Sequence, residues 1–208
     1  MSFKRIFLSG TMGVMLAGCA VSMGKAFLID DFNTVYRPEI RSVGILPFDN
    51  RTQTLGVENT LRDKVYERMA KLSGVKGSPV IVSQEQIDNA LSGEGLIGYS
   101  QVMNVPMQGL GQKLGVDAVL VGMVRVYVEP TGGQRFSSLI INLGQARSTV
   151  ETLFQLYSCK DGQLLWEKVS TGNFEPIFAV SALISSPEQA ANLMCDDLVA
   201  AWPFKKKS

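Results

Sequence analysis

The sequence predicts a domain of the α/β or α+β class, with a central sheet and helices packed over it. Three observations support this prediction. Short apolar runs typical of buried strands alternate with segments whose apolar residues recur at helical spacing. Two segments of alternating polarity flank Asp161-Gly162, which indicates a hairpin. A helix start signal at 186–189 (SPEQ) precedes the last periodic segment, and such mixing is typical of a sheet covered by helices.

The first predicted elements are a strand, a helix and a second strand. Residues 42–48 (SVGILPF) form a compact apolar run, which predicts a buried strand. Residues 57–72 carry apolar side chains at helical spacing with charged residues such as Arg62 between them, and predict an amphipathic helix. PVIV at 79–82 predicts a second short strand. The apolar face of the helix is expected to comprise Val57, Leu61, Val65, Met69 and Leu72.

The middle of the chain predicts two helices, a loop and a long strand. SQEQ, beginning at Ser83, is a capping box, so a helix is expected to start there. Residues 92–105 predict a Gly-rich loop, and 107–114 a short helix with Gly115 as its C-terminal cap. Residues 117–129 are apolar at first and then alternate, which predicts a strand.

The last third predicts a hairpin and a closing helix. Residues 148–158 and 163–172 should pair, because the Asp-Gly sequence between them supplies the positive φ that a tight turn needs. An insertion at 130–146 precedes the hairpin. Pro187 suits the first position of a helix, so the final helix is expected to begin there. Its inward side is expected to comprise Leu193, Met194, Leu198 and Val199.

The N-terminus has the layout of a secretory signal peptide. Lys4 and Arg5 supply a short positive start, and residues 6–16 are apolar and uncharged. This run is too short for a bilayer-spanning helix, which needs about 20 apolar residues. The sequence LAGC at 16–19 then resembles the bacterial lipobox. The alternative, a small apolar cysteine in an ordinary buried helix, does not account together for the charge, the length and the position of Cys19.

The lipobox resemblance implies a lipid anchor at Cys19. By that resemblance the thiol carries a diacylglycerol, the signal is cut just before it, and the new amine is acylated, for example with palmitate. Three chains at about 0.8 kcal/mol per buried methylene would make the membrane anchor effectively permanent. Ala20 follows the cysteine, where an aspartate would favour retention in the inner membrane. We therefore expect a lipoprotein of the outer membrane that faces the periplasm.

The predicted organisation has four parts: a signal peptide at 1–18, a lipidated N-terminus and tether at 19–40, one periplasmic domain at 41–204 and a basic tail at 205–208. Removal of the signal leaves 190 residues, which suits one domain. The mature chain has 18 basic and 19 acidic residues, so it lacks the positive excess that nucleic-acid-binding proteins carry. We expect no nucleic-acid partner.

The two remaining cysteines, Cys159 and Cys195, leave two alternatives open. An exported protein meets an oxidising compartment, where two thiols can form a disulfide. The other interpretation is a pair of buried, unpaired thiols. The sequence places the first at a strand end and the second in a helix, and does not decide between the two.

The sequence lacks the usual signatures of catalysis. It contains no histidine, which removes the common nucleophile systems and the commonest metal ligand. Gly93, Gly95 and Gly98 satisfy GxGxxG, but they follow a helix rather than a strand, so a flexible loop is expected instead of a dinucleotide site. We expect no cofactor, no metal and no enzymatic activity. Three carboxylates near element ends, Asp49, Glu58 and Asp117, could form a catalytic pair but lack partners in the sequence.

Two apolar segments, 136–144 and 174–186, lie outside the regular pattern. Exposed apolar patches mark interfaces or membrane contact, so the connections at 129–146 and 173–186 are candidates for contact with the membrane or with neighbouring subunits. The alternative is that both segments pack onto their own domain.

The C-terminus offers a second candidate for membrane contact. Trp202 and Phe204 precede three lysines, and aromatic and basic side chains suit the lipid headgroup surface. The alternative is a solvated tail after the last helix.

Several of these pieces occur in an order that resembles a known superfamily. SVGILPFDNRT, a helix, PVIVSQEQIDNAL, QKLGVDAVLVGMV and DGQLLWE follow one another behind the lipobox. This order resembles the envelope lipoproteins that include the curli secretion channel CsgG, the polysaccharide-export lipoprotein PelC and the peptidoglycan-synthase activator LpoB. The resemblance covers residues 41–172. It implies an α/β, three-layer domain without enzymatic activity, with a central mixed sheet flanked by helices and a C-terminal helix.

The resemblance also implies two functions. The first is a structural component of a secretion or export assembly at the outer membrane, built from several copies or from envelope protein partners. The second is a regulatory binding module that activates a peptidoglycan synthase. About 20 residues separate Cys19 from the first predicted strand, which is short for crossing the periplasm and favours the first function.

Overall fold

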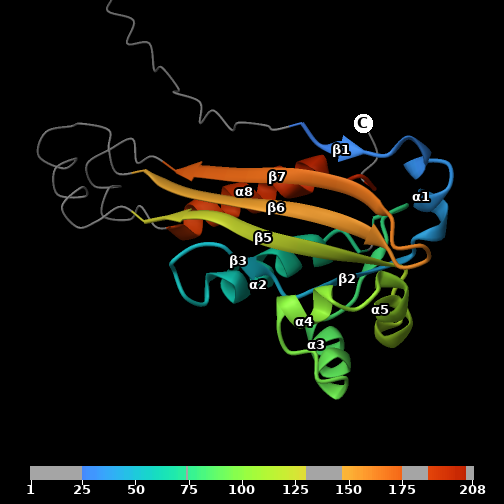
Figure 1. Ribbon diagram of the computed structural model, residues 1–208. Helices are drawn as coiled ribbons and strands as arrows, with labels where there is room; N and C mark the ends of the chain where they lie inside the picture. The colour runs from blue at the N-terminus through green and yellow to red at the C-terminus, as the bar shows by residue number, and fades with distance from the viewer. Residues whose placement is uncertain (1–24, 74, 130–146, 175–186, 205–208) are drawn as a thin grey trace, which may run out of the picture.

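Seven strands form one mixed, open sheet in the structure, a computed structural model that describes residues 25–73, 75–129, 147–174 and 187–204 (Figure 1). The sheet order is β1-β7-β6-β5-β2-β4, and β3 also pairs with β5. The elements in chain order are β1 (Phe27–Leu28), η1 (Asp30–Phe32), α1 (Tyr36–Glu39), β2 (Ser42–Ile45), β3 (Asp49–Asn50), α2 (Val57–Ala70), β4 (Val80–Ile81), α3 (Gln84–Gly93), α4 (Tyr99–Met103), α5 (Met107–Leu114), β5 (Ala118–Val128), β6 (Ser148–Ser158), β7 (Leu164–Phe174) and α8 (Pro187–Ala201).

The sheet is parallel on one side and antiparallel on the other. β2 runs parallel to β4 and to β5, and β3 runs parallel to β5. Helices connect these strands, as parallel pairing requires. β5, β6, β7 and β1 are antiparallel neighbours. Gly162 turns the β6–β7 hairpin with a φ of 76°. The structure thus confirms the predicted α/β fold with a mixed sheet, flanking helices and a C-terminal helix.

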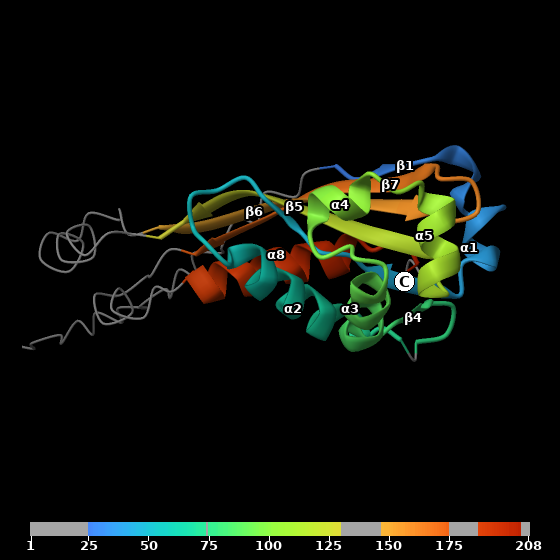
Figure 2. The same ribbon diagram turned by 60° about the horizontal axis from the view of Figure 1, so that its bottom comes forward.

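Helices cover both faces of the sheet, which makes three layers (Figure 2). Ala118 and Leu120, two positions apart in β5, point into a core that α2 and α8 complete. Val119 and Val121 point to the opposite face, into a smaller core formed with α3, α4 and α5. Successive side chains of a strand alternate between faces, so β5 serves both cores.

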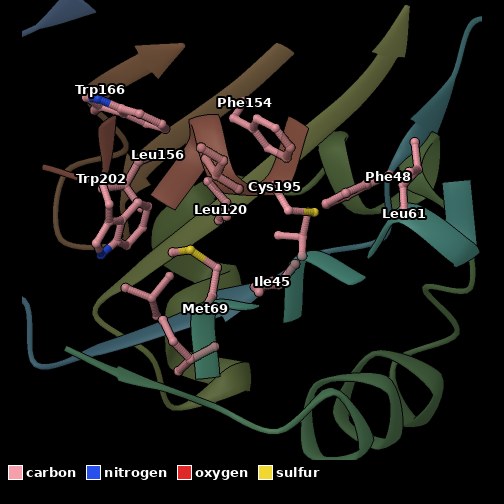
Figure 3. Packing of buried hydrophobic residues seen from close by; sticks show 14 of the residues in the cluster. Ile45, Phe48, Leu61, Met69, Leu120, Phe154, Leu156, Trp166, Cys195 and Trp202 are labelled. Atoms are coloured by element: carbon pink, nitrogen blue, oxygen red, sulfur yellow. The ribbon is translucent and has the colours of Figure 1, made fainter. Parts of the chain in front are cut away.

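The larger core holds most of the aromatic side chains. Phe48 and Phe154 meet edge to face with ring centroids 5.9 Å apart. Trp166 of β7 and Trp202, just after α8, meet in the same way at 5.8 Å, and Figure 3 shows these two rings side by side. Phe204 packs against Trp202 at 5.5 Å. Such pairs add to the stabilisation that the burial of their area provides.

The C-terminal residues therefore correct one prediction. Trp202 is 2% exposed and Phe204 is 1% exposed. Neither alternative from the sequence, a headgroup contact or a solvated tail, is right, because both rings are part of the core under the sheet. The basic tail at 205–208 lies outside the described residues.

α2 confirms the predicted helix and adds one buried charge. Val57, Leu61, Val65 and Met69 are buried as expected. Arg62, expected on the polar side, is also buried. Its guanidinium donates to the carbonyl oxygen of Ile45 at 2.8 Å and pairs with Asp88. The charge thus satisfies the carbonyl at the end of β2, where the chain leaves the sheet.

The structure also corrects the predicted tether at 19–40. Residues 27–40 belong to the domain, because β1 pairs with β7 in the register Phe27 to Glu167. Phe32 is 0% exposed and Tyr36 is 8% exposed. The domain therefore begins near residue 27 and not at residue 41. Two strand residues are too few to produce a pattern in the sequence.

The predicted loop at 92–105 contains a short helix, α4. Gly98 lies just before this helix, and its backbone N–H donates a hydrogen bond to the side chain of Gln101 at 3.2 Å. Val102 of α4 is buried in the smaller core. Among the residues that the structure describes, no helix is long and apolar enough to cross a membrane.

The two edges of the sheet differ. At one edge, the backbone N–H of Ile81 in β4 donates to the hydroxyl of Ser73 at 2.9 Å, so this edge donor is already used. At the other edge, β1 pairs only with Trp166 and Glu167 of β7. Among the described residues no strand covers the outer edge of β7 at 168–174. An uncovered edge strand is a template for pairing with another chain.

Candidate functional site

A pocket of about 510 Å³ lies at the end of the sheet where β6 ends and β5 begins. α1, α5 and the turn after β6 form its walls. Three side chains, Ile40, Val116 and Cys159, give it an apolar floor. Gly111 of α5 completes the floor, because a Cβ at that position would overlap the side chain of Cys159. The close approach of α5 to the end of β6 therefore depends on glycine.

Asp117 anchors the pocket end of the sheet. Its Oδ2 accepts hydrogen bonds from the backbone N–H of Arg41 at 2.9 Å and of Ser42 at 3.0 Å. It also accepts from the hydroxyl of Ser42 at 2.9 Å. These bonds join the start of β5 to the start of β2. Asp117 thus has the structural role of a polar strand start.

Tyr36 connects α1 to the β6–β7 turn. Its hydroxyl lies 2.6 Å from Oδ2 of Asp161 and 2.5 Å from Oε1 of Gln163, and its single proton can serve one of these acceptors at a time. The hydrogen bond to Asp161, with burial and the nearby carboxylates, raises the pKa of Tyr36 to about 12. Burial would raise the pKa of Asp161, but hydrogen bonds from Tyr36, Ser158 and backbone N–H groups outweigh it and lower that pKa.

The rim of the pocket carries one ion pair and two carboxamides. Nζ of Lys160 pairs with the carboxylate of Glu39 at 2.9 Å. Gln108 and Gln112 of α5 line the pocket and are exposed. Sequence patterns do not point to the glutamines, because polar side chains on a helix surface are ordinary, nor to Tyr36, because it lies in the predicted tether.

The two cysteines of the domain are separate, free thiols. Cys159 belongs to the smaller core and Cys195 to the larger core on the other face of the sheet. The structure therefore contradicts the disulfide alternative and shows buried, unpaired thiols. Burial raises the pKa of each thiol to about 12, so neither is a nucleophile near neutral pH.

The other candidate residues do not assemble into a catalytic centre. Asp49 pairs with Arg51, and Glu58 accepts from the side chain of Asn50 at 2.8 Å, so each carboxylate has a local partner. The glycines of the GxGxxG match, Gly93, Gly95 and Gly98, occupy the end of α3 and the loop to α4. Within the described part of the chain, no three His, Cys, Asp or Glu side chains gather closely enough to hold a metal ion.

The strands that precede the two apolar segments, 136–144 and 174–186, both end on the side of the sheet opposite the pocket. Val128, near the end of β5, pairs with Thr149, and Ser148 pairs with Phe174 at the end of β7. The connections that follow β5 and β7 therefore begin at the same end. β6 has 11 residues, so this end lies roughly 35 Å from the pocket. Cys19 and the stretches 130–146 and 175–186 themselves lie outside the described residues.

Comparisons with known proteins show the fold. Neither a protein-family profile nor a curated protein matches the sequence. The solved lipoprotein GNA1162 of Neisseria meningitidis is similar in structure, with a TM-score of 0.54 and 18% identity over 77% of this chain and 93% of that chain.

Two other solved structures resemble the chain less closely. The PelC dodecamer of Paraburkholderia phytofirmans has a TM-score of 0.44 and 15% identity over 76% of this chain and 84% of that chain. Escherichia coli LpoB has a TM-score of 0.42 and 12% identity over 85% of this chain and 84% of that chain. Their superposition is too loose to carry an argument. What the comparisons establish is that this chain is similar in fold to the Neisseria lipoprotein.

Proposed function

We propose that the chain is a lipid-anchored, non-enzymatic lipoprotein at the periplasmic side of the outer membrane, and a structural component of a secretion or export assembly. The lipobox-like sequence ending at Cys19 supports the anchor. The fold it has in common with the lipoprotein GNA1162 supports the class of protein. The observation that carries the proposal is the pairing of β1 with β7, because it limits how far the domain can lie from its anchor.

The distance follows from the chain between Cys19 and β1. Residues 19–26 are eight residues, and an extended chain spans at most about 3.5 Å per residue. The sheet therefore begins within roughly 28 Å of the lipidated residue. The longer tether that the sequence suggested, 19–40, would have allowed roughly 75 Å. The short connection keeps the domain beside the membrane and disfavours the alternative, a regulator that reaches across the periplasm to a peptidoglycan synthase.

The position at which the two apolar segments follow the sheet further supports the proposal. Both connections begin at one end of the sheet, so their apolar residues can act as one contact surface towards a neighbouring copy or the membrane. Contacts of one copy's surface with a different surface on the next copy would close a ring.

The anchor is tested by labelling. Cells that express the full precursor are fed labelled palmitate, and the label on the purified protein is measured. We expect Cys19→Ala to lose the label. Cys159→Ala is the matched control and should keep it, because this thiol is buried in the domain. Full labelling of the Cys19→Ala protein would overturn the anchor.

The assembly is tested by mass. Light scattering of the detergent-extracted, lipidated protein, with the detergent subtracted, should give a discrete oligomer or a complex with envelope proteins. A strict monomer that brings down no partner would contradict the assembly function. A monomer that brings down a peptidoglycan synthase would support the alternative.

A further inference from the structure

Most polar groups of the pocket already form hydrogen bonds or ion pairs within the protein. Oδ2 of Asp117 accepts three hydrogen bonds that hold β2 and β5 together. The hydroxyl of Tyr36 bonds to the β6–β7 turn. Lys160 and Glu39 form an ion pair. These groups are therefore engaged in contacts that hold the fold together.

The carboxamides of Gln108 and Gln112 are different. Neither side chain makes a hydrogen bond to any residue that the structure describes. They are four residues apart on α5, so they project from the same face of the helix. A Cβ on Gly162 would lie 3.3 Å from Nε2 of Gln108, which places this amide beside the β6–β7 turn. Two adjacent amides thus stand at the pocket, each able to donate and to accept.

The surroundings restrict the charge and shape of a ligand. The floor of Ile40, Val116 and Cys159 is apolar and suits a methyl group or another small apolar group. Lys160 is neutralised by Glu39, and Asp117 adds a carboxylate, so the pocket has no positive excess to attract an anion. These charges disfavour an anion, and the charged groups are already bonded within the protein, so we expect a ligand that combines uncharged hydrogen-bonding groups with small apolar ones.

We propose that this pocket binds a neutral ligand that carries secondary amides next to small apolar groups, and that Gln108 and Gln112 are its binding residues. A secondary amide presents one donor and one acceptor, which is the complement of a carboxamide. Two sources have this chemistry: an N-acetylated sugar chain, with its acetyl methyl groups, and an extended peptide with small side chains. The proposal does not depend on the lipid anchor or on assembly.

The test is an NMR titration of the mature chain with Cys19→Ala, which lacks the lipid and keeps every described residue. The side-chain amide signals of Gln108 and Gln112 are followed, together with the backbone amide signals of the pocket residues Gly111 and Lys160, which the glutamine variants keep. The probes are the trimer of N-acetylglucosamine and an acetylated, amidated trialanine peptide. Maltotriose, which has hydroxyl groups and no amide, is the ligand control.

We expect saturable shifts of both glutamine signals with one amide probe and none with maltotriose, and the probe that binds identifies the source. Gln108→Ala with Gln112→Ala should weaken binding at least about tenfold, because two hydrogen bonds are lost. Gln53→Ala is the matched control, an exposed glutamine outside the pocket, and should bind normally. No saturable shift with either amide probe, equal binding of maltotriose, or unchanged binding by the double variant would overturn the proposal.

Discussion

Lys168 of β7 and Asp197 of α8 form an ion pair inside the larger core. Nζ lies 3.1 Å from Oδ2, and each side chain is 2% exposed. This oxygen accepts no hydrogen bond in the structure, so the contact is electrostatic. The hydroxyl groups of Thr152 and Ser170, on the same side of β6 and β7, also have no hydrogen-bond partner among the described residues. The surface between α8 and the sheet therefore contains polar groups among apolar ones.

Removing one member of this pair should destabilise the fold strongly. Asp197→Ala removes the carboxylate that pairs with the buried Lys168 and is expected to lower the free energy of unfolding by about 3–5 kcal/mol. Lys168→Met combined with Asp197→Leu removes both charges and should cost less than the single change. Urea unfolding followed by the fluorescence of Trp166 and Trp202, both buried, measures this difference. A double variant that is less stable than Asp197→Ala would contradict the explanation.

Gly172 of β7 should not tolerate a side chain. A Cβ there would overlap the carbonyl oxygen of Ala190 and come within 2.6 Å of the backbone nitrogen of Met194, so α8 rests directly on the glycine. Gly172→Ala is expected to cost about 1–3 kcal/mol or more, since backbone has to move. Gly93→Ala is the control, because a Cβ at this helix end meets nothing within 4 Å. Equal thermal stability of the two variants would contradict the conclusion that α8 rests directly on Gly172.

The thiols of Cys159 and Cys195 should be present and unreactive in the folded protein. Burial raises both pKa values to about 12 from the usual 9.0. The protonated thiols therefore stabilise the fold fully below about pH 9, and this contribution is lost as the pH rises through about 12. In the Cys19→Ala protein a thiol reagent at pH 8 should modify neither residue before denaturation and both afterwards. Mass spectrometry of a linked Cys159–Cys195 peptide would contradict the structure.

Tyr36→Phe should change the titration of Asp161. The tyrosine hydroxyl is one of the groups that lower the pKa of this carboxyl against burial, so its loss should raise that pKa. A depressed carboxyl pKa stabilises the fold above its unfolded value, and this contribution is lost as the pH falls through the folded value. The variant should thus be less stable than the parent at neutral pH, with the gap narrowing in acid. Carbon-detected NMR of Asp161 checks the shift, and an unchanged pKa would contradict the role given to Tyr36.

The sequence predicted the elements whose patterns are long and regular. α2 and the β6–β7 hairpin cover many residues, so periodicity and turn chemistry agree over their whole length. The order of these elements was enough for the fold class. β1 could not be predicted, because its two residues are held by β7, far away in the chain. The burial of Trp202 and Phe204 could not be predicted for the same reason, because it depends on neighbours distant in sequence.

The candidate pocket was not predictable from the sequence. It is formed where α1, α5 and the β6–β7 turn meet, and none of these segments carries a motif that marks a binding site. Gln108 and Gln112 look like ordinary surface residues of a helix. Only the close approach at Gly111, which the sequence does not reveal, places them above an apolar floor. Arg62 was misassigned because its charge suggested solvent, whereas its guanidinium is buried, donates to a backbone carbonyl and pairs with Asp88.

The unequal edges of the sheet limit how copies of this protein can join through their strands. The hydroxyl of Ser73 already occupies the donor of Ile81 in β4, whereas the 168–174 edge of β7 pairs with no strand among the described residues. Two copies that paired through this edge would use the same surface twice, around a two-fold axis. Such a pair would cover the 168–174 edge of both copies, so this edge could not join a third copy. Strand pairing through it would therefore stop at a dimer, and a ring would have to be closed by other surfaces.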